Sequence, residues 1–227
     1  MAKFDIKGLN LEIPDRFLTP VLREELRTGS YEWGEARALG AVLRKGDHLL
    51  DLGSAIGFIA SLAAQTLDDR NITCIEANPE LIPVLERNLA QNGAPRAGLI
   101  HGAVVGGNHR SEQVTLELRP AFYSSRLSSE TSDGKGRLVE VPALHLSDLL
   151  VAFEPDVVTM DLEGVEAGLA VLPWPGKVRA VVMELHTKYY DLSTVDEIFA
   201  GMARNGFAYQ PRGSRGDVVV FQRIGTE

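Results

Sequence analysis

Cysteine and long apolar runs are both scarce in this chain. It contains one cysteine, Cys74, so it has no internal disulfide framework, and a lone cysteine is typical of a reducing compartment. The first residues alternate between polar and apolar, unlike the apolar core of a signal peptide. No uncharged stretch reaches the roughly 18 residues that are needed to span a bilayer. We therefore predict a cytoplasmic protein with no membrane partner.

Positive charge is also in short supply. Lysine and arginine together number 23 against 31 aspartate and glutamate residues, which gives a formal net charge of −8. A protein that binds nucleic acid regardless of sequence needs a basic face against the phosphates. The charge therefore argues against a nucleic-acid partner, although it leaves a nucleotide-sized ligand open. The apolar fraction, 44%, is that of a chain that buries a normal core.

Strands and helices are predicted to alternate through most of the chain, which indicates a largely parallel sheet with helices on both faces. The last two strands, Phe207–Gln210 and Asp217–Gln222, flank a turn that contains two glycines and predict an antiparallel hairpin. The fold class is therefore an α/β sandwich. Its other main strands are expected at His48–Leu52, Asn71–Glu76, Leu99–Val104, Val157–Asp161 and Ala180–Leu185.

Two polar segments predict the starts of helices. Asn78-Pro79-Glu80 combines a capping side chain with a proline, which suits a first helical turn. Ser193-Thr194-Val195-Asp196 resembles a capping box. We expect the second of these helices to end at Asn205-Gly206.

The domain organisation is predicted to be one main domain with an N-terminal extension. Residues 1–45 are expected to form a hairpin and helices that pack on the core, and residues 46–227 to form the main domain. A polar insertion at about 119–137 interrupts the alternation. It is interpreted either as a lid whose Tyr123 and Arg126 grip a ligand or as a disordered insertion.

The segment from Asp51 to Gly57 lies between a predicted strand and a predicted helix, where an open α/β sheet binds its ligand. Glycines allow a tight turn and close approach of the backbone, and the helix start offers free N–H groups. The spacing is D-x-G-x-x-x-G rather than the G-x-G-x-x-G of dinucleotide enzymes. A carboxylate before the turn would repel a pyrophosphate but suits the ammonium group of a methionine moiety. The turn therefore predicts S-adenosylmethionine.

An acid at the end of the next strand supports this prediction. Glu76 follows Gly57 by about 20 residues, the position at which an acid accepts hydrogen bonds from ribose hydroxyls. Ala103 and Val104, at the end of the third strand, are candidates to border an adenine ring. The alternative interpretation is that Asp51 and Glu76 are surface carboxylates and that the loop is only a tight turn.

A second acidic cluster follows two later strands. Residues two apart on a strand share a face, so Asp161 lies with Glu163 and Glu184 with His186. If the strands are neighbours, three carboxylates and an imidazole meet near the cofactor. Two readings stay open: one of these groups is the general base that takes a hydroxyl proton, or they bind a divalent cation that lowers the pKa of the hydroxyl. Glu166 alone is interpreted as merely opening a helix.

These motifs together resemble the FkbM family of methyltransferases. The resemblance runs in order from about Tyr31 to His186 and rests on Tyr31-Glu32, Gly46-Asp47 through Gly57, Glu76-Ala77-Asn78-Pro79, Leu146-Ser147-Asp148-Leu149-Leu150, Asp161-Leu162-Glu163-Gly164-Val165-Glu166 and Glu184-Leu185-His186. It implies a three-layer Rossmann-like sandwich around a mostly parallel seven-stranded sheet. It also implies methyl transfer to a hydroxyl oxygen of a sugar or another small molecule. One departure is visible, because family members often have Ala-Asn where this chain has Ser54-Ala55.

The resemblance and the motifs together give the candidate site residues. Candidates for the reacting centre are His186, Glu184, Asp161 and Glu163. Candidates for cofactor binding are Glu32, Asp51, Gly53, Ser54, Gly57, Phe58, Glu76, Ala77, Asn78, Ala103, Val104 and Asp161.

We therefore expect an S-adenosylmethionine-dependent O-methyltransferase that acts on a small-molecule or glycan acceptor. Two alternatives are kept: a nicotinamide-dependent oxidoreductase, and a non-catalytic protein that binds S-adenosylmethionine.

Overall fold

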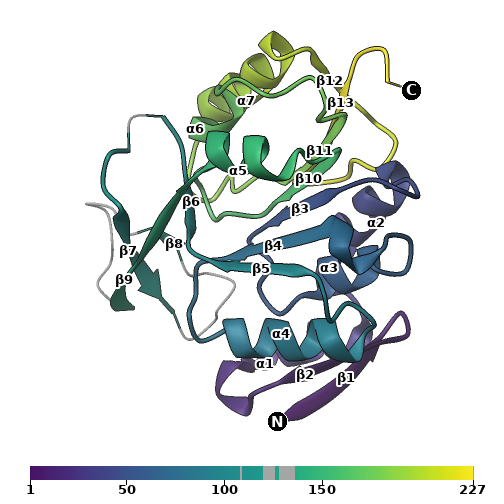
Figure 1. Ribbon diagram of the computed structural model, residues 1–227. Helices are drawn as coiled ribbons and strands as arrows, with labels where there is room; N and C mark the ends of the chain where they lie inside the picture. Colours follow the sequence, from purple (N-terminus) through teal and green to yellow (C-terminus); the bar gives the residue numbers. More distant parts are fainter. Residues whose placement is uncertain (108, 120–125, 128–135, 227) are drawn as a thin grey trace.

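The computed structural model describes residues 1–107, 109–119, 126–127 and 136–226 of the 227-residue chain. Within these residues, a central sheet of seven strands runs through the molecule in the order β12-β13-β11-β10-β3-β4-β5 (Figure 1). The strands are β3 (Leu49–Leu52), β4 (Ile72–Glu76), β5 (Gly98–His101), β10 (Val157–Met160), β11 (Ala180–Glu184), β12 (Phe207–Tyr209) and β13 (Val218–Arg223).

The pairing of these strands confirms the predicted α/β class with a C-terminal antiparallel hairpin. The neighbours from β11 through β10, β3 and β4 to β5 are parallel, whereas β13 is antiparallel to both β11 and β12. The order reverses at β3 and β10, which are hydrogen-bonded to each other with Asp51 opposite Thr159. In an open parallel sheet this switch point is where a ligand binds, at the carboxyl ends of the strands.

Helices cover both faces of the sheet, as the continuous burial of strands such as β3 and β10 requires. On β11, Ala180 and Val182 join one core cluster, and Val181 and Met183 join the other. The first cluster includes side chains of α1 (Pro20–Thr28), α2 (Trp33–Val42), α3 (Phe58–Ala63) and α4 (Ile82–Gln91). The second includes side chains of α5 (Leu146–Phe153), α6 (Glu166–Ala170) and α7 (Leu192–Arg204). Two short 3₁₀ turns, η1 (Asp15–Phe17) and η2 (Asp69–Asn71), complete the helical elements that the structure describes.

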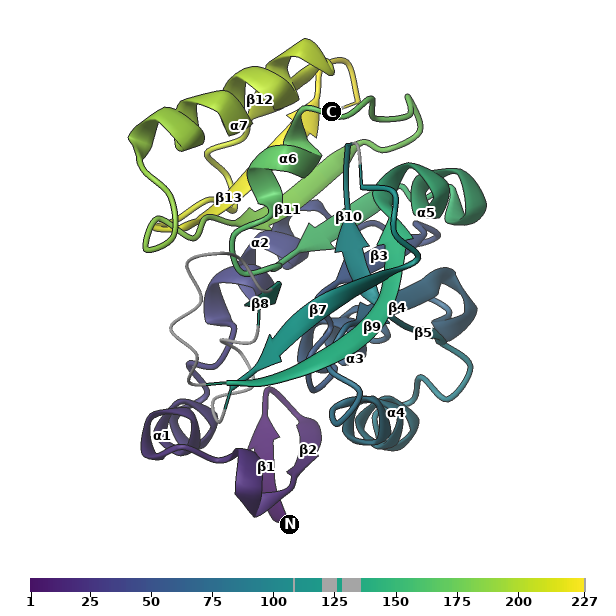
Figure 2. The ribbon, with the colours of Figure 1, turned by 90° about the vertical axis from the view of Figure 1, so that its left-hand side faces the viewer.

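Two smaller sheets flank the central one (Figure 2). An N-terminal hairpin of β1 (Ala2–Ile6) and β2 (Leu9–Ile13) lies beside α4, with residues of both strands in the first core cluster. The second, in the order β6-β9-β7-β8, is made of β6 (Ala103–Val105), β7 (Gln113–Leu118), β8 (Arg126–Leu127) and β9 (Arg137–His145). Most of the predicted polar insertion lies outside the described residues.

The strand that was expected over residues 99–104 is divided at Gly102. β5 ends at His101 in the central sheet, and β6 begins at Ala103 in the smaller one. A Cβ at Gly102 would lie 2.7 Å from Leu144 and 2.9 Å from the carbonyl oxygen of Pro142, so glycine lets the two sheets meet here. The continuous-strand prediction is therefore wrong, because tertiary packing breaks a locally favourable run.

Two predicted helix caps are also wrong. Asn78 does not cap α4, which begins four residues later at Ile82; its Oδ1 instead accepts a hydrogen bond from the N–H of Glu80 at 3.0 Å, closing a turn. At α7 the cap is Asp191 rather than Ser193, since its carboxylate accepts from the N–H of Thr194 at 3.1 Å. In the part of the chain that the structure describes, no helix has the length and apolarity to cross a membrane.

We expect the substitution Asn88→Ala to lower the free energy of unfolding, because Asn88 pairs two backbone groups. Asn88 is fully buried; its Oδ1 accepts from the N–H of Glu12 at 2.9 Å and its amide donates to the carbonyl of Ile56 at 2.8 Å, tying the hairpin to the glycine turn. Each buried group left unpaired costs about 1–3 kcal/mol. Urea unfolding should show a loss of this size. The matched control is Glu86→Ala, an exposed residue of the same helix, and an equal loss in both variants would contradict the prediction.

Candidate functional site

The turn after β3 is shaped by close contact with the loop after β10. Gly53 has φ +87°, and a Cβ there would lie 2.0 Å from the carbonyl oxygen of Asp161. The N–H groups of Gly53 and Ser54 both donate to the carbonyl of Ile75, at 2.9 and 3.0 Å. Gly57, with φ +82°, precedes the first residue of α3. Only glycine at position 53 allows the backbone to come this close to the carbonyl of Asp161, which explains why the motif has a glycine there.

Two cavities open beside this turn at the carboxyl ends of the strands. The larger encloses about 690 Å³ of space, part of which is open to solvent. Its lining includes many of the sequence candidates: Glu32, Gly53, Glu76, Ala77, Asn78, Ala103, Val104, Asp161 and Glu163. The smaller, of about 330 Å³, adds Asp51 and Ser54. Gly57 and Phe58 are not among the lining residues of either cavity; Phe58 is fully buried and packs edge-to-face on Tyr31.

The smaller cavity is strongly acidic. Glu32, Glu35, Asp51 and Asp161 all line it. Asp51 Oδ1 accepts from the hydroxyl of Thr159 at 2.5 Å, whereas its buried Oδ2 has no hydrogen-bond partner among the described residues. Burial raises the pKa of Asp51, Glu32 and Glu35. An orphaned carboxylate oxygen among further acids fits a cationic ligand, such as the ammonium and sulfonium groups of S-adenosylmethionine.

Glu76 is held where β4 ends. Its Oε2 accepts from the N–H of Ala55 at 2.8 Å and its Oε1 from the N–H of Asn78 at 2.6 Å. Burial raises the pKa of this carboxyl to about 7. Ala55 itself has φ +46°, which a non-glycine residue adopts at a cost, so the turn is bent toward Glu76. Each carboxylate oxygen retains a second lone pair for a donor in the cavity.

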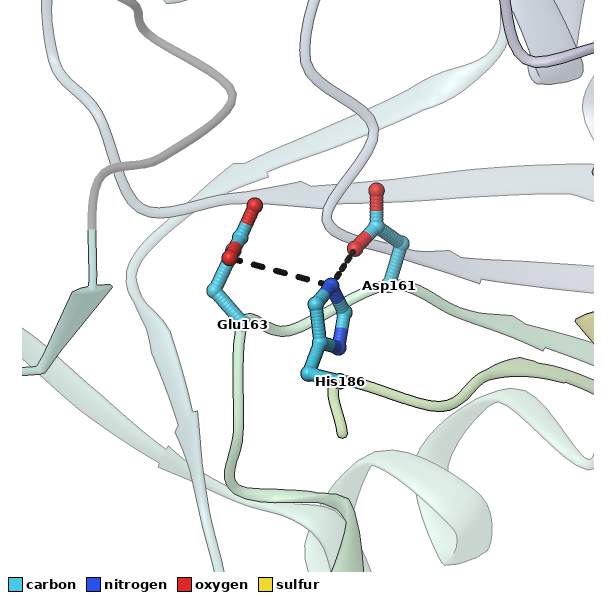
Figure 3. A group of neighbouring side chains, drawn as sticks. All are labelled: Asp161, Glu163 and His186. Atoms are coloured by element: carbon cyan, nitrogen blue, oxygen red, sulfur yellow. Dashed lines mark ion pairs between the residues drawn. The ribbon is translucent and has the colours of Figure 1, made fainter. Parts of the chain in front are cut away.

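The structure brings together Asp161, Glu163 and His186, which the sequence placed on neighbouring strand ends (Figure 3). His186 Nε2 lies 3.2 Å from Asp161 Oδ1 and 3.7 Å from Glu163 Oε2. Glu184 Oε2 is 4.0 Å from the same nitrogen. β10 and β11 are parallel neighbours in the sheet, so their carboxyl ends lie side by side. The four side chains at these ends therefore cluster together.

The prediction that Glu166 merely opens a helix is wrong. Glu166 is fully buried, and its Oε1 lies 2.9 Å from His186 Nδ1 while accepting the N–H groups of Leu162 and Gly164, both at 3.2 Å. It therefore orients the imidazole in addition to beginning α6. The signal was its place in the D-x-E-G-x-E element, five residues after Asp161.

The charges of the cluster act strongly on one another. Burial opposes protonation of His186, but the carboxylates of Asp161 and Glu166 outweigh it and raise its pKa to about 11. Burial raises the pKa of Asp161 to about 6, and burial together with nearby Glu35 raises that of Glu184 to about 7. The site thus favours a positive charge at His186 Nε2.

Two side chains that the sequence analysis did not select complete the surroundings. Glu35, on α2, is buried beside the smaller cavity, and its first-turn position gave no sign of this. Lys188, in the loop after β11, places its ammonium 3.1 Å from Glu163 Oε2. Its sequence position, two residues after His186, was the available signal.

Comparison with known proteins gives the family of the chain. The chain matches the methyltransferase FkbM domain over residues 51–209, more than half of its length. It is similar to precorrin-6y C5,15-methyltransferase from Geobacter metallireducens GS-15 (11% identity, 94% of each chain covered, TM-score 0.47). It is also similar to fibrillarin from Aeropyrum pernix with natively bound S-adenosylmethionine (14% identity, 82% of this chain and 72% of that chain covered, TM-score 0.44). No curated protein matches it.

The protein is therefore a Rossmann-like methyltransferase that depends on S-adenosylmethionine. Within this class it belongs to the family defined by the FkbM methyltransferase domain. This assignment decides against the nicotinamide-dependent alternative. It also favours an enzyme over a protein that only binds the cofactor.

We expect Gly53→Ala to abolish measurable binding of S-adenosylhomocysteine. The added methyl group would overlap the carbonyl oxygen of Asp161, so the turn or the opposite loop must move. The control is Gly46→Ala, at φ +90° with open space around its Cβ, which carries only the backbone strain of about 1–2 kcal/mol. Calorimetric titration of both variants tests this, and unchanged affinity in Gly53→Ala would refute it.

Proposed function

We propose that this enzyme transfers a methyl group to a hydroxyl oxygen of a small molecule or a sugar. The observation that carries the proposal is the cluster of Asp161, Glu163, Glu184 and His186, of which Asp161 and Glu163 line the larger cavity. A hydroxyl is a poor nucleophile until its proton is removed or its pKa is lowered. A crowd of carboxylates beside the cofactor cavity suits that task.

We assign the cofactor to the two neighbouring cavities, and the acidic side chains that line them decide its orientation. Its methionine end is placed in the smaller cavity, where Asp51 and Glu32 face its ammonium group. Its adenosine is placed in the larger cavity, with the ribose hydroxyls donating to Glu76 and the adenine beside Ala103 and Val104. The cavities share Gly53, Glu32 and Asp161, which fits one elongated ligand.

When bound, S-adenosylmethionine supplies a methyl group that is already activated by the sulfonium charge. The chain then has to orient the acceptor and accept its proton. We assign the proton to Glu184: Asp161 is paired with His186 at 3.2 Å and Glu163 with Lys188 at 3.1 Å, whereas Glu184 lies 4.0 Å from His186 Nε2 and faces the carboxyl of Glu35. The proton leaves the hydroxyl oxygen, binds the Glu184 carboxylate, and passes later to water.

A small acceptor is favoured over a nucleic acid by charge. The chain carries a net −8, and acids surround the cavities, so a polyanion would be repelled. A neutral polyhydroxylated molecule meets no such barrier and finds many hydrogen-bond acceptors. The acceptor is therefore proposed to be a neutral small molecule or glycan.

We expect the affinity for S-adenosylhomocysteine to rise with pH through neutrality. Burial raises the pKa of Glu76 to about 7, and ribose hydroxyls donate best to the ionised form, so binding lowers this pKa. Protonation at pH 6 must therefore weaken binding, by about tenfold relative to pH 8 for a single group. In Glu76→Gln the affinity should be lower and this pH step smaller; calorimetry at both pH values measures it. An undiminished step in the variant would assign it to another group.

We expect Glu184→Gln to lower kcat by at least about 100-fold while the affinity for S-adenosylhomocysteine stays within twofold. Methyl transfer from labelled S-adenosylmethionine to a panel of sugars and small alcohols provides the assay, with bulk RNA and protein as competing acceptors. The matched control is Glu140→Gln, on β9, whose carboxylate accepts from Thr115. Full activity of Glu184→Gln would remove its role, and methylation of RNA or protein alone would overturn the proposed acceptor.

A further inference from the structure

The cluster around His186 holds more negative than positive charge. Four carboxylates, those of Asp161, Glu163, Glu166 and Glu184, lie within 4.0 Å of its two ring nitrogens. Asp161 Oδ1 is buried 3.2 Å from Nε2, and this ion pair is the contact that the described residues give it. Such groups are stable in a protein interior only when a cation or a donor compensates them.

We propose that Asp161, Glu163 and His186 bind a divalent transition-metal cation at the edge of the cofactor cavity. One ligand atom from each lies within 4.8 Å of the others (Figure 3). Ligands bonded to a cation at about 2.1 Å are about 3.0–3.4 Å apart. The distances from His186 Nε2, 3.2 Å to Asp161 Oδ1 and 3.7 Å to Glu163 Oε2, are close to this spacing.

The imidazole is held as a metal-binding histidine usually is. His186 is 4% exposed, and its Nδ1 faces Glu166 Oε1 at 2.9 Å, so its Nε2 points at the two carboxylates. Glu166 is fixed in turn by two backbone N–H groups. A carboxylate on the far ring nitrogen sets the tautomer and strengthens the ligand nitrogen. A cation that binds here displaces the proton that Asp161 otherwise holds on Nε2, while Nδ1 keeps its proton toward Glu166.

The backbone at Glu163 supports the assignment independently. Glu163 has φ +53°, a left-handed conformation that costs a non-glycine residue free energy, and Gly164 follows at φ +113°. Such strain collects at ligand-binding sites, where it aims a side chain. Here it directs the carboxylate of Glu163 toward His186 (Figure 3). A glutamate that only covered the surface would not offset the free-energy cost of this backbone conformation.

Lys188 provides the discriminating contact. Its ammonium lies 3.1 Å from Glu163 Oε2, one of the proposed ligand atoms, and its side chain is 56% exposed. The lysine therefore competes with a metal for that oxygen. If the cluster is only a salt-bridge network, Lys188 stabilises it; if it is a metal site, removing Lys188 must tighten metal binding.

The ligand set selects among cations. One imidazole nitrogen with carboxylate oxygens favours Zn²⁺, Co²⁺ and Mn²⁺ over Ca²⁺, which prefers oxygen alone. Three protein ligands leave positions open for oxygens of the acceptor. The role of the cation, lowering the pKa of the acceptor hydroxyl before Glu184 takes the proton, rests on the proposed function. Binding of the cation does not.

The experiment uses the full chain after chelation, without cofactor or acceptor. Calorimetry with Zn²⁺, Co²⁺, Mn²⁺ and Ca²⁺ should show one site, with affinity falling in that order, and bound Co²⁺ should give visible absorption bands of histidine–carboxylate coordination. His186→Ala and Asp161→Asn should lose this binding, and Glu166→Gln should weaken it about 10–100-fold. Lys188→Ala should bind more tightly, whereas Glu140→Gln should bind as the parent chain does.

Absence of binding, or binding that survives both His186→Ala and Asp161→Asn, would overturn the metal site. If His186→Ala does not fold, as thermal unfolding will show, Asp161→Asn and Lys188→Ala still decide the matter. Titration with S-adenosylhomocysteine is performed separately. A chain that binds the cofactor product but no metal fails only this inference, and one that binds metal but no cofactor product fails only the proposed function.

Discussion

The backbone of Gly53 passes so close to the carbonyl of Asp161 that no side chain fits between them. This contact joins the turn after β3 to the loop after β10, at the point where the order of the sheet reverses. Because the strands are hydrogen-bonded neighbours, the distance between the two loops is fixed by the sheet rather than by the loops themselves. The positions of the cofactor turn and of the acidic cluster both depend on this contact between Gly53 and Asp161.

The site contains buried carboxyl groups, which need a hydrogen-bond donor or a cation nearby to be stable in their ionised form. Asp51 carries an oxygen with no hydrogen-bond partner among the described residues, Glu76 is held by backbone N–H groups, and Asp161 lies against His186. Burial raises the pKa of each of the three, so each gains from a nearby donor or cation. A cofactor with two positive groups, an imidazole and a metal cation are different ways of meeting one electrostatic requirement. The proposed function and the proposed cation thus share a physical cause.

Much of the fold was predictable because its signals are local. Alternation of strands and helices gave the sandwich, and the D-x-G-x-x-x-G spacing gave the turn. The break at Gly102 was missed because it depends on contact with the distant residue Leu144. The role of Asn78 was missed because its Oδ1 closes a turn with the N–H of Glu80 instead of capping α4, which begins at Ile82. The D-x-E-G-x-E element marks Glu166, but its role was missed because the histidine that it faces lies 20 residues further along the chain.

The sequence by itself determined which residue types stand at the strand ends: a carboxylate before a glycine turn, an acid after the second strand, and the Asp-x-Glu and Glu-x-His pairs. Those types follow from spacing along one chain, where period and turn chemistry act within a few residues. Only the tertiary structure decided that β10 and β11 are neighbours and that Glu166 reaches His186 from behind. Strand order is set by packing and pairing over long distances in sequence, and a site made from several strand ends exists only once that order is fixed.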